Sequence, residues 1–311
     1  MTKGESVLID WLSAHFSALP AHVPLGIGDD MCIIATGDET VLLSSDILLD
    51  GVHFDSATHS LESVGRKALA CGLSDCAAMA VQPRAATVSV ALPNSFNLSH
   101  VKALYDEMKT LGERFECPVA GGDTTSWNQP LVIDVTVMAC PYPGINPILR
   151  SGAQPGDWLY VTGPLGGSLL GRHLTFEPRV HEAHRLAENL GGALHAMLDI
   201  SDGLSLDLHR LCASSKVGAR LDESLLQNVV HDDAVDAARR DGRSRLDHVL
   251  GDGEDFELLL AVSGDPVESV GGVRLQRVGE MVASDVVIRR LDGRVEPLAM
   301  QGYEHFRQAR Q

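Results

Sequence analysis

The chain has 311 residues, of which 44% are hydrophobic and 22% are charged, and this composition is typical of a globular protein with room for two ordinary domains. It carries 25 Lys and Arg residues against 42 Asp and Glu residues, and the resulting net charge of −17 disfavours nucleic acid and anionic membrane surfaces as partners. A substrate that carries phosphate would need divalent cations between itself and this protein.

The first half of the chain is predicted to alternate helices and strands. Leu8, Trp11, Leu12 and Phe16 fall on one helical stripe, so we expect residues 5–19 to form a helix that docks on the rest of the protein. The other elements expected here are helices at 61–79 and 99–115 and strands at 31–34, 40–46, 84–93 and 131–140.

A proline-rich stretch at 141–157 is predicted to separate two domains. We place the boundary near residue 150, with one domain at 1–148 and the other at 149–311. Beyond it we expect strands at 157–163, 256–264 and 273–282, a helix at 184–197, and a loop that leads into a helix at 200–217. Helices and strands are mixed in both halves, which predicts an α/β or α+β fold.

The cysteine pattern indicates a reducing compartment. The six cysteines are scattered with no C-x-x-C pair, so we interpret them as small buried hydrophobic residues. No cationic leader precedes an apolar run at the N-terminus, and no uncharged apolar stretch reaches about 18 residues. We therefore expect a cytoplasmic protein.

Acidic residues recur in small or glycine-rich turns beside apolar segments. The acids are Asp30 in "GIGDD", Asp46 in "SSD", Asp75 in "LSD", Asp123 in "GGD", Asp199, Asp202 and Asp207 in "DISDGLSLD", and Asp252, Glu254, Asp255 and Glu257 in "GDGEDFE". Any one of them could be a helix cap or an Asx turn, and Asp202 before Gly203 fits a cap. Their recurrence favours a shared site.

Acids beside serine and glycine point to a hard divalent cation. Mg²⁺ takes oxygen ligands, typically a few carboxylates, waters and substrate phosphates. The 13 histidines show no H-E-x-x-H pattern, which disfavours zinc. We therefore expect magnesium.

Familiar phosphate-binding and nucleophile motifs are absent from the sequence. There is no G-x-x-x-x-G-K-[ST] and no G-x-S-x-G. The stretch "VTGPLGGSLLG" at 161–171 is predicted to run from a strand through a glycine-rich turn into a helix, but its spacing does not match G-x-G-x-x-G. A tight turn with close packing is favoured there over a dinucleotide site.

Taken in order, the motifs resemble those of the thiamine-monophosphate kinases, which belong to the superfamily of aminoimidazole ribonucleotide synthetase. The motifs are "GIGDD", "SSDILLDGVHF", "KALACGLSDCAAM", "VAGGDTT", "RSGAQPGDWLYVTGPLG", "DISDGLSLDL", "GEDFELL" and "GYEHF", and they cover residues 25–306. The resemblance implies transfer of the γ-phosphate of ATP to thiamine monophosphate, giving thiamine diphosphate and ADP. It also implies an N-terminal α/β domain that forms a shared β-barrel in a homodimer, and a C-terminal α+β domain.

The resemblance also implies roles for single residues. The implied magnesium ligands are Asp30, Ser44, Ser45, Asp46, Asp75, Asp123, Asp199 and Asp202. The implied ATP contacts are Tyr105, Gly122, Arg150 and Ser201, and the implied contacts to thiamine monophosphate are His53, Glu254 and Tyr303. The chain departs from the family pattern at Gly72, Gly167 and Asp252, where the family usually has Asn, an acid and Gly.

The acceptor implied by this resemblance is itself a phosphate. Its second pKa of about 6 leaves it largely dianionic at pH 7, so no side-chain base is needed. We expect direct in-line transfer assisted by several Mg²⁺ ions, with Lys67 and Arg150 as the candidate cations in the motifs. The alternatives are another ATP-dependent enzyme of the superfamily, ligase-like or selenophosphate-forming, and a non-catalytic protein that binds nucleotide and metal.

Overall fold

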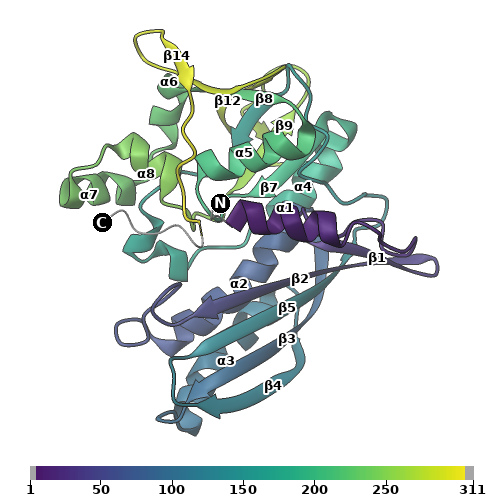
Figure 1. Cartoon of the computed structure of the whole chain (residues 1–311), viewed down its shortest axis with the longest axis vertical. Coiled ribbons are helices and arrows are strands. Elements are labelled where there is room, and N and C mark those ends of the chain that lie inside the picture. The colour runs from purple at the N-terminus through teal and green to yellow at the C-terminus, as the bar shows by residue number, and fades with distance from the viewer. Residues whose placement is uncertain (1–4, 305–311) are drawn as a thin grey trace.

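The computed structural model describes residues 5–304, which form two mixed sheets with helices packed on them (Figure 1). In the view of Figure 1 the first half of the chain lies below and the second half above. This arrangement confirms the predicted mixture of α and β elements in both halves. Among the described residues, no helix has both the length and the apolar character needed to cross a bilayer.

The first sheet has five strands in the order β1-β2-β5-β3-β4, and all neighbours are antiparallel except β3 and β4. The elements of this half are α1 (Glu5–His15), β1 (Cys32–Thr36), β2 (Glu39–Leu49), α2 (Leu61–Ala78), β3 (Val81–Pro93), α3 (Leu98–Arg114), β4 (Val119–Trp127) and β5 (Val132–Pro141). Along β5 Ile133, Val135, Val137 and Ala139 are buried while the residues between them are not, so helices cover only one face of the sheet.

Helix α2 packs closely against α3 and contacts the first sheet. Ser60 caps α2 by accepting a hydrogen bond from the backbone N–H of Ser63 at 3.2 Å. Gly65 allows the two helices to approach closely, because a Cβ at this position would lie 1.9 Å from the carbonyl oxygen of Leu104. Helix α2 therefore packs tightly on α3, and it also contacts strands β2, β3 and β5 of the sheet.

The second sheet has seven strands in the order β14-β13-β8-β12-β6-β9-β7, and only the β13–β8 pair is parallel. Its strands are β6 (Trp158–Val161), β7 (Leu194–Asp199), β8 (Gly218–Asp222), β9 (Leu258–Val262), β12 (Gln276–Val282), β13 (Val286–Arg289) and β14 (Val295–Pro297), and β10 (Ser269–Val270) pairs separately with β11 (Val273–Arg274). The helices are α4 (Val180–Leu190), α5 (Leu204–Ser215), α6 (Glu223–Leu226), α7 (Asp232–Asp241), α8 (Arg245–Gly251) and the short 3-10 helices η1 (Ser168–Leu170), η2 (Arg172–Leu174), η3 (Gly191–Ala193) and η4 (Gln227–Val229).

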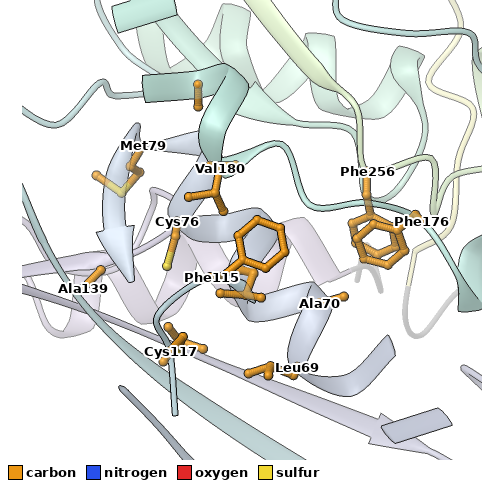
Figure 2. Close-up of a cluster of buried hydrophobic side chains, with 14 of the residues drawn as sticks. Leu69, Ala70, Cys76, Met79, Phe115, Cys117, Ala139, Phe176, Val180 and Phe256 are labelled. Atoms are coloured by element: carbon orange, nitrogen blue, oxygen red, sulfur yellow. The ribbon is translucent and has the colours of Figure 1, made fainter. Parts of the chain in front are cut away.

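One hydrophobic cluster joins the two halves. Figure 2 shows Cys76 of α2 near Val180 of α4, and the rings of Phe176 and Phe256 stacked with centroids 4.0 Å apart. Because this cluster takes residues from both halves, the loops of the second half are fixed against α2. The junction between the halves is thus a packed core, and the candidate site lies beside it.

Two predicted helices differ from the structure in the second half. The helix expected at 184–197 ends at Leu190, and "LHAMLD" forms β7, because Gly191 adopts a positive φ of 50° and ends the helix. The helix expected after "VTGPLGG" is only the 3-10 turn η1. Gly167 there has a φ of 73°, and a Cβ would lie 2.2 Å from the backbone carbon of Asp233, so the close-packed turn is the correct interpretation.

The helix predicted at 5–19 forms as α1, but its expected docking is not observed. Leu8, Trp11 and Phe16 are 41%, 56% and 54% exposed, so the apolar stripe faces away from the rest of the described chain. The period of the pattern identified the helix, whereas burial depends on tertiary contacts that the pattern does not report.

Candidate active site

Helix α2 contributes one polar stripe to the site. Lys67, Cys71 and Asp75 stand four residues apart, so their side chains share one face of the helix, and all three line a cavity of about 690 Å³. This face points to the junction of the two halves. The stripe is the sequence signal that could have added Cys71 to the predicted site.

Strand β2 contributes Ser44, Ser45 and Asp46. These residues lie in the interior of the strand, whereas the strand expected at 40–46 ended at Asp46. Ser45 and Asp46 line the cavity. Ser44 Oγ and Asp46 Oδ2 are buried without a hydrogen-bond partner in the structure. Burying a polar atom without a hydrogen-bond partner costs free energy, so these two oxygen atoms are candidates for binding a ligand.

Three carboxylates from distant segments converge at the centre of the site. Oxygen atoms of Asp30, Asp75 and Asp199 all lie within 4.8 Å of one another. Burial, and then the neighbouring acids, raises the pKa of Asp75 well above its usual range, and burial and Asp30 do the same for Asp199. Burial also raises the pKa of Asp46 to about 6. Burial and mutual repulsion thus disfavour the ionised carboxylates when no cation is bound, and a divalent ion would offset this cost.

Arg150 partly compensates these acids. Its guanidinium donates to Asp30 from Nε at 3.0 Å and from Nη2 at 2.6 Å. Its backbone N–H also donates to Asp29 Oδ2 at 3.2 Å. This bidentate pair fixes Asp30 at the edge of the carboxylate cluster.

The other end of the cavity is lined by His53, Glu254 and Tyr303. Tyr303 is held there by its backbone N–H, which donates to the carbonyl of Asp202 at 3.0 Å. The Glu254 carboxylate accepts from Lys67 Nζ at 2.7 and 2.8 Å. Ser201 and Asp202 also line the cavity.

Two departures from the family pattern contact each other. The backbone N–H of Gly167 donates to Asp252 Oδ2 at 2.9 Å, and the same carboxylate oxygen lies 2.8 Å from His248 Nδ1. Gly72, the third departure, packs under β5, where a Cβ would lie 2.5 Å from a methyl carbon of Val137. Asp252 is thus occupied in holding the turn at Gly167, although it also lines the cavity.

Asp30, Ser44 and Arg150 lie beside the carboxylates without lining this cavity, and three further predicted site residues are not brought to it within one chain. Asp46, Val135, Val88 and Gly122 are successive partners across the sheet, so Gly122 lies three strand spacings, roughly 14 Å, from Asp46. Asp123 follows it on β4 and is exposed. Tyr105 lies half-buried on α3, outside the cavity lining.

The structure adds cavity residues that the prediction had not included. His59 and His173 have ring centroids 5.6 Å apart, and Phe54 and Phe256 also line the cavity. Burial lowers the pKa of His173 to about 4, so its ring is neutral at pH 7. Phe54 and Phe256 lie inside the motifs "SSDILLDGVHF" and "GEDFELL", which could have indicated them, whereas no quoted motif contains His59 or His173.

Two protein-family models match this chain, one in each half. The family model for the N-terminal domain of AIR synthase related proteins matches residues 28–140, and the model for the C-terminal domain matches residues 154–291. The fold is that of this class, and the chain belongs to it.

Relatives narrow the class further. A thiamine-monophosphate kinase of Rhodopirellula baltica is 38% identical, with 97% of each chain covered. The solved structure of "AaThiL complexed with AMPPCP and TMP" has a TM-score of 0.82 at 25% identity, covering 97% of each chain. The thiamine-monophosphate kinase structure from Stenotrophomonas maltophilia has a TM-score of 0.70 at 29% identity, covering 96% of this chain and 99% of that one. This chain belongs to the thiamine-monophosphate kinase family.

Proposed function

We propose that this protein transfers the γ-phosphate of ATP to thiamine monophosphate and releases thiamine diphosphate and ADP. The observation that carries the proposal is one cavity that joins a carboxylate cluster to His53, Glu254 and Tyr303. The relatives named above and the neighbour bound to AMPPCP and TMP support the same pair of substrates. In this proposal residues 1–148 form the ATP, magnesium and dimerisation domain, and residues 149–311 complete the acceptor site.

The carboxylate cluster fits magnesium, and we propose that several Mg²⁺ ions bind at this site. Three carboxylates within 4.8 Å of one another and two buried oxygen atoms without partners form an all-oxygen donor set. The proposed ligands are Asp30, Ser44, Ser45, Asp46, Asp75, Asp123, Asp199 and Asp202. When bound, the ions would neutralise phosphate oxygens that the acidic chain would otherwise repel.

In the proposed reaction the protein's own residues bind the two substrates and orient them toward each other. Tyr105, Gly122, Arg150 and Ser201 are proposed to hold ATP, and His53, Glu254 and Tyr303 the thiamine end of the acceptor. The acceptor phosphate is the nucleophile, so transfer is direct and in line, with no phosphorylated protein as intermediate. Rapid quench with labelled ATP checks this: label trapped on the protein during turnover would overturn direct transfer.

A homodimer with a shared barrel explains the uncovered face of the first sheet. Ile47, Trp127 and Met138 are 56%, 39% and 38% exposed, and β4 is exposed almost throughout. A second copy on this face would bring Gly122 and Asp123 of one subunit toward the carboxylates of the other. Light scattering should give twice the mass of the 33.3 kDa chain, and a monomer for Met138→Asp. A monomeric wild type that is fully active would exclude the dimer from the site.

An ADP-release assay with product identification tests the function. Thiamine monophosphate, thiamine and an aminoimidazole-type acceptor are each supplied with ATP and Mg²⁺. We expect ADP and thiamine diphosphate only with thiamine monophosphate. Turnover only with another acceptor would support a different enzyme of the superfamily, and no turnover with any would support a non-catalytic nucleotide-binding protein.

A further inference from the structure

Lys67 contacts both sides of the acceptor end of the cavity. Its Nζ donates to the carbonyl oxygen of His53 at 2.6 Å and to Glu254 Oε1 and Oε2 at 2.7 and 2.8 Å. His53 precedes Lys67 by 14 residues, whereas Glu254 follows it by 187. One ammonium group therefore connects a loop of the first half of the chain to a loop of the second half.

The charge environment of Lys67 is strongly acidic. Asp46, Asp75, Asp199 and Asp202 line the same cavity, and Lys67 is the only Lys or Arg among the described residues that do so. Its side chain is 1% exposed, so its ammonium must find partners inside the protein. His53 and Glu254 occupy its donors. Lys67 is consequently engaged with the protein itself, and not extended toward the carboxylate cluster where phosphates would bind.

The loop that carries Glu254 is held in an unfavourable backbone conformation. Glu254 and Phe256 have φ values of 52° and 51°, in the left-handed region that residues other than glycine avoid. Backbone N–H groups of these two residues donate to the carbonyls of Ser201 at 2.6 Å and Ile200 at 2.8 Å, which fixes the main chain. The Glu254 carboxylate accepts hydrogen bonds at both of its oxygens from Lys67 Nζ. The direction of this carboxylate thus depends on Lys67.

We propose that Lys67 is a positioning residue for the acceptor: it fixes the Glu254 carboxylate and the His53 loop in the geometry that binds thiamine monophosphate. This inference rests on the proposed kinase function, because that function assigns Glu254 and His53 to the acceptor. Lys67 acts through these two groups and touches neither substrate. Its loss should therefore impair acceptor binding far more than ATP binding.

Steady-state kinetics of four variants test this role. Lys67→Met removes the ammonium at similar length, Glu254→Gln removes the charge that it meets, and the double variant removes both. Lys109→Met is the matched control, because Lys109 is an exposed lysine on α3. Each variant is titrated separately with thiamine monophosphate and with ATP, and its folding is checked by circular dichroism.

We expect Lys67→Met to raise KM for thiamine monophosphate at least tenfold, with KM for ATP within twofold of wild type. In the Glu254→Gln background the same substitution should change KM for thiamine monophosphate less than threefold, because its main partner is already altered. Lys109→Met should change neither KM. If Lys67→Met alone does not fold, comparison of the double variant with Glu254→Gln tests the same dependence, since the unpaired, partly buried carboxylate is then absent.

Three results would overturn the positioning role. They are an equal rise of both KM values, an acceptor KM that does not change, and an effect of Lys67→Met that is equally large with and without Glu254→Gln. A wild-type protein that forms no thiamine diphosphate would instead refute the kinase function itself. An active wild type with any of the three results refutes only the role of Lys67.

Discussion

Arg150 holds Asp30 through two parallel hydrogen bonds of 3.0 and 2.6 Å, although they are 120 residues apart in the chain. Burial by itself would lower the pKa of Arg150, but Asp30, Asp29 and Asp199 together raise it above its ordinary value. The residue lies in the predicted linker region, and its charge offsets acids of both halves. This ion pair lowers the free-energy cost of burying the carboxylate cluster when no metal ion is bound.

The first prediction concerns the loss of this pair. Arg150→Met leaves Asp30 buried beside Asp75 and Asp199 without its cation, so we expect the metal-free protein to lose about 3–5 kcal/mol of unfolding free energy. Urea unfolding measures the change. Arg185→Met, which removes a half-exposed arginine on α4, should stay within about 0.5 kcal/mol of wild type. Equal losses of unfolding free energy in the two variants would mean that the ion pair between Arg150 and Asp30 stabilises the protein no more than an exposed arginine does.

The second prediction concerns the central carboxylate. Asp75→Asn should lower Mg²⁺-dependent turnover on the order of 100-fold, because one anionic ligand is lost. In the absence of metal the variant should be at least as stable as wild type at pH 7.5, since a neutral amide replaces a buried carboxyl group whose ionised form burial disfavours. Asp106→Asn, at an exposed position of α3, is the control for both the turnover and the stability measurement. Wild-type turnover in Asp75→Asn would remove Asp75 from the metal site.

The third prediction concerns pH. The folded-state pKa of Asp46 is about 6 and its ordinary value is 3.8, so the folded state binds the proton more tightly. Metal-free wild type should therefore lose stability relative to Asp46→Asn as pH rises from about 4 to about 6, by up to about 1.4 kcal/mol per pH unit.

The comparison with this variant is needed because His173, whose pKa is lowered to about 4, contributes a trend of the opposite sign in both proteins. Urea titrations at several pH values in a chelator measure the difference. A stability difference that does not vary with pH would contradict the raised pKa of Asp46. Mg²⁺ should stabilise wild type more at pH 7.5 than at pH 5, because its ligands must first lose their protons.

The fourth prediction concerns acceptor recognition. Tyr303 lines the cavity and is 44% exposed, so its ring is accessible to a ligand. Tyr303→Ala should raise KM for thiamine monophosphate about tenfold through lost ring contact, with little change in KM for ATP. Tyr303→Phe should retain most of the affinity. An equal rise of both KM values in Tyr303→Ala would move this residue away from the acceptor.

The fifth prediction tests the helix packing that supports the site. Gly65→Ala would place a Cβ 1.9 Å from the carbonyl oxygen of Leu104, so α2 and α3 must separate. We expect a loss of about 2–3 kcal/mol of unfolding free energy. Gly192→Ala, where a Cβ meets nothing within 4 Å, should be nearly neutral in the same urea measurement. Equal stability of the two variants would show that the helices adjust without cost.

The sequence predicted four of the eight elements of the first half within one or two residues at both ends, and it missed β4 (Val119–Trp127). Helices expected at 61–79 and 99–115 are α2 (Leu61–Ala78) and α3 (Leu98–Arg114). Their patterns are long and regular, and Ser60 and Asn97 cap them. The helix expected at 184–197 was wrong because short apolar runs such as "LHAM" suit a buried strand as well as a helix, and tertiary pairing with β9 decides between them.

Candidate acids were readable from the sequence because a carboxylate next to small residues is a local chemical pattern. The sequence by itself thus determined the family, the mixed fold and the residue types that a magnesium and phosphate site requires. Only the tertiary structure decided which of them meet: it joined Asp30, Asp75 and Asp199, left Gly122 and Asp123 at an exposed strand, and connected Lys67 to Glu254. The physical reason is that burial and distance between remote segments arise from helix and sheet packing, which no local pattern of residues encodes.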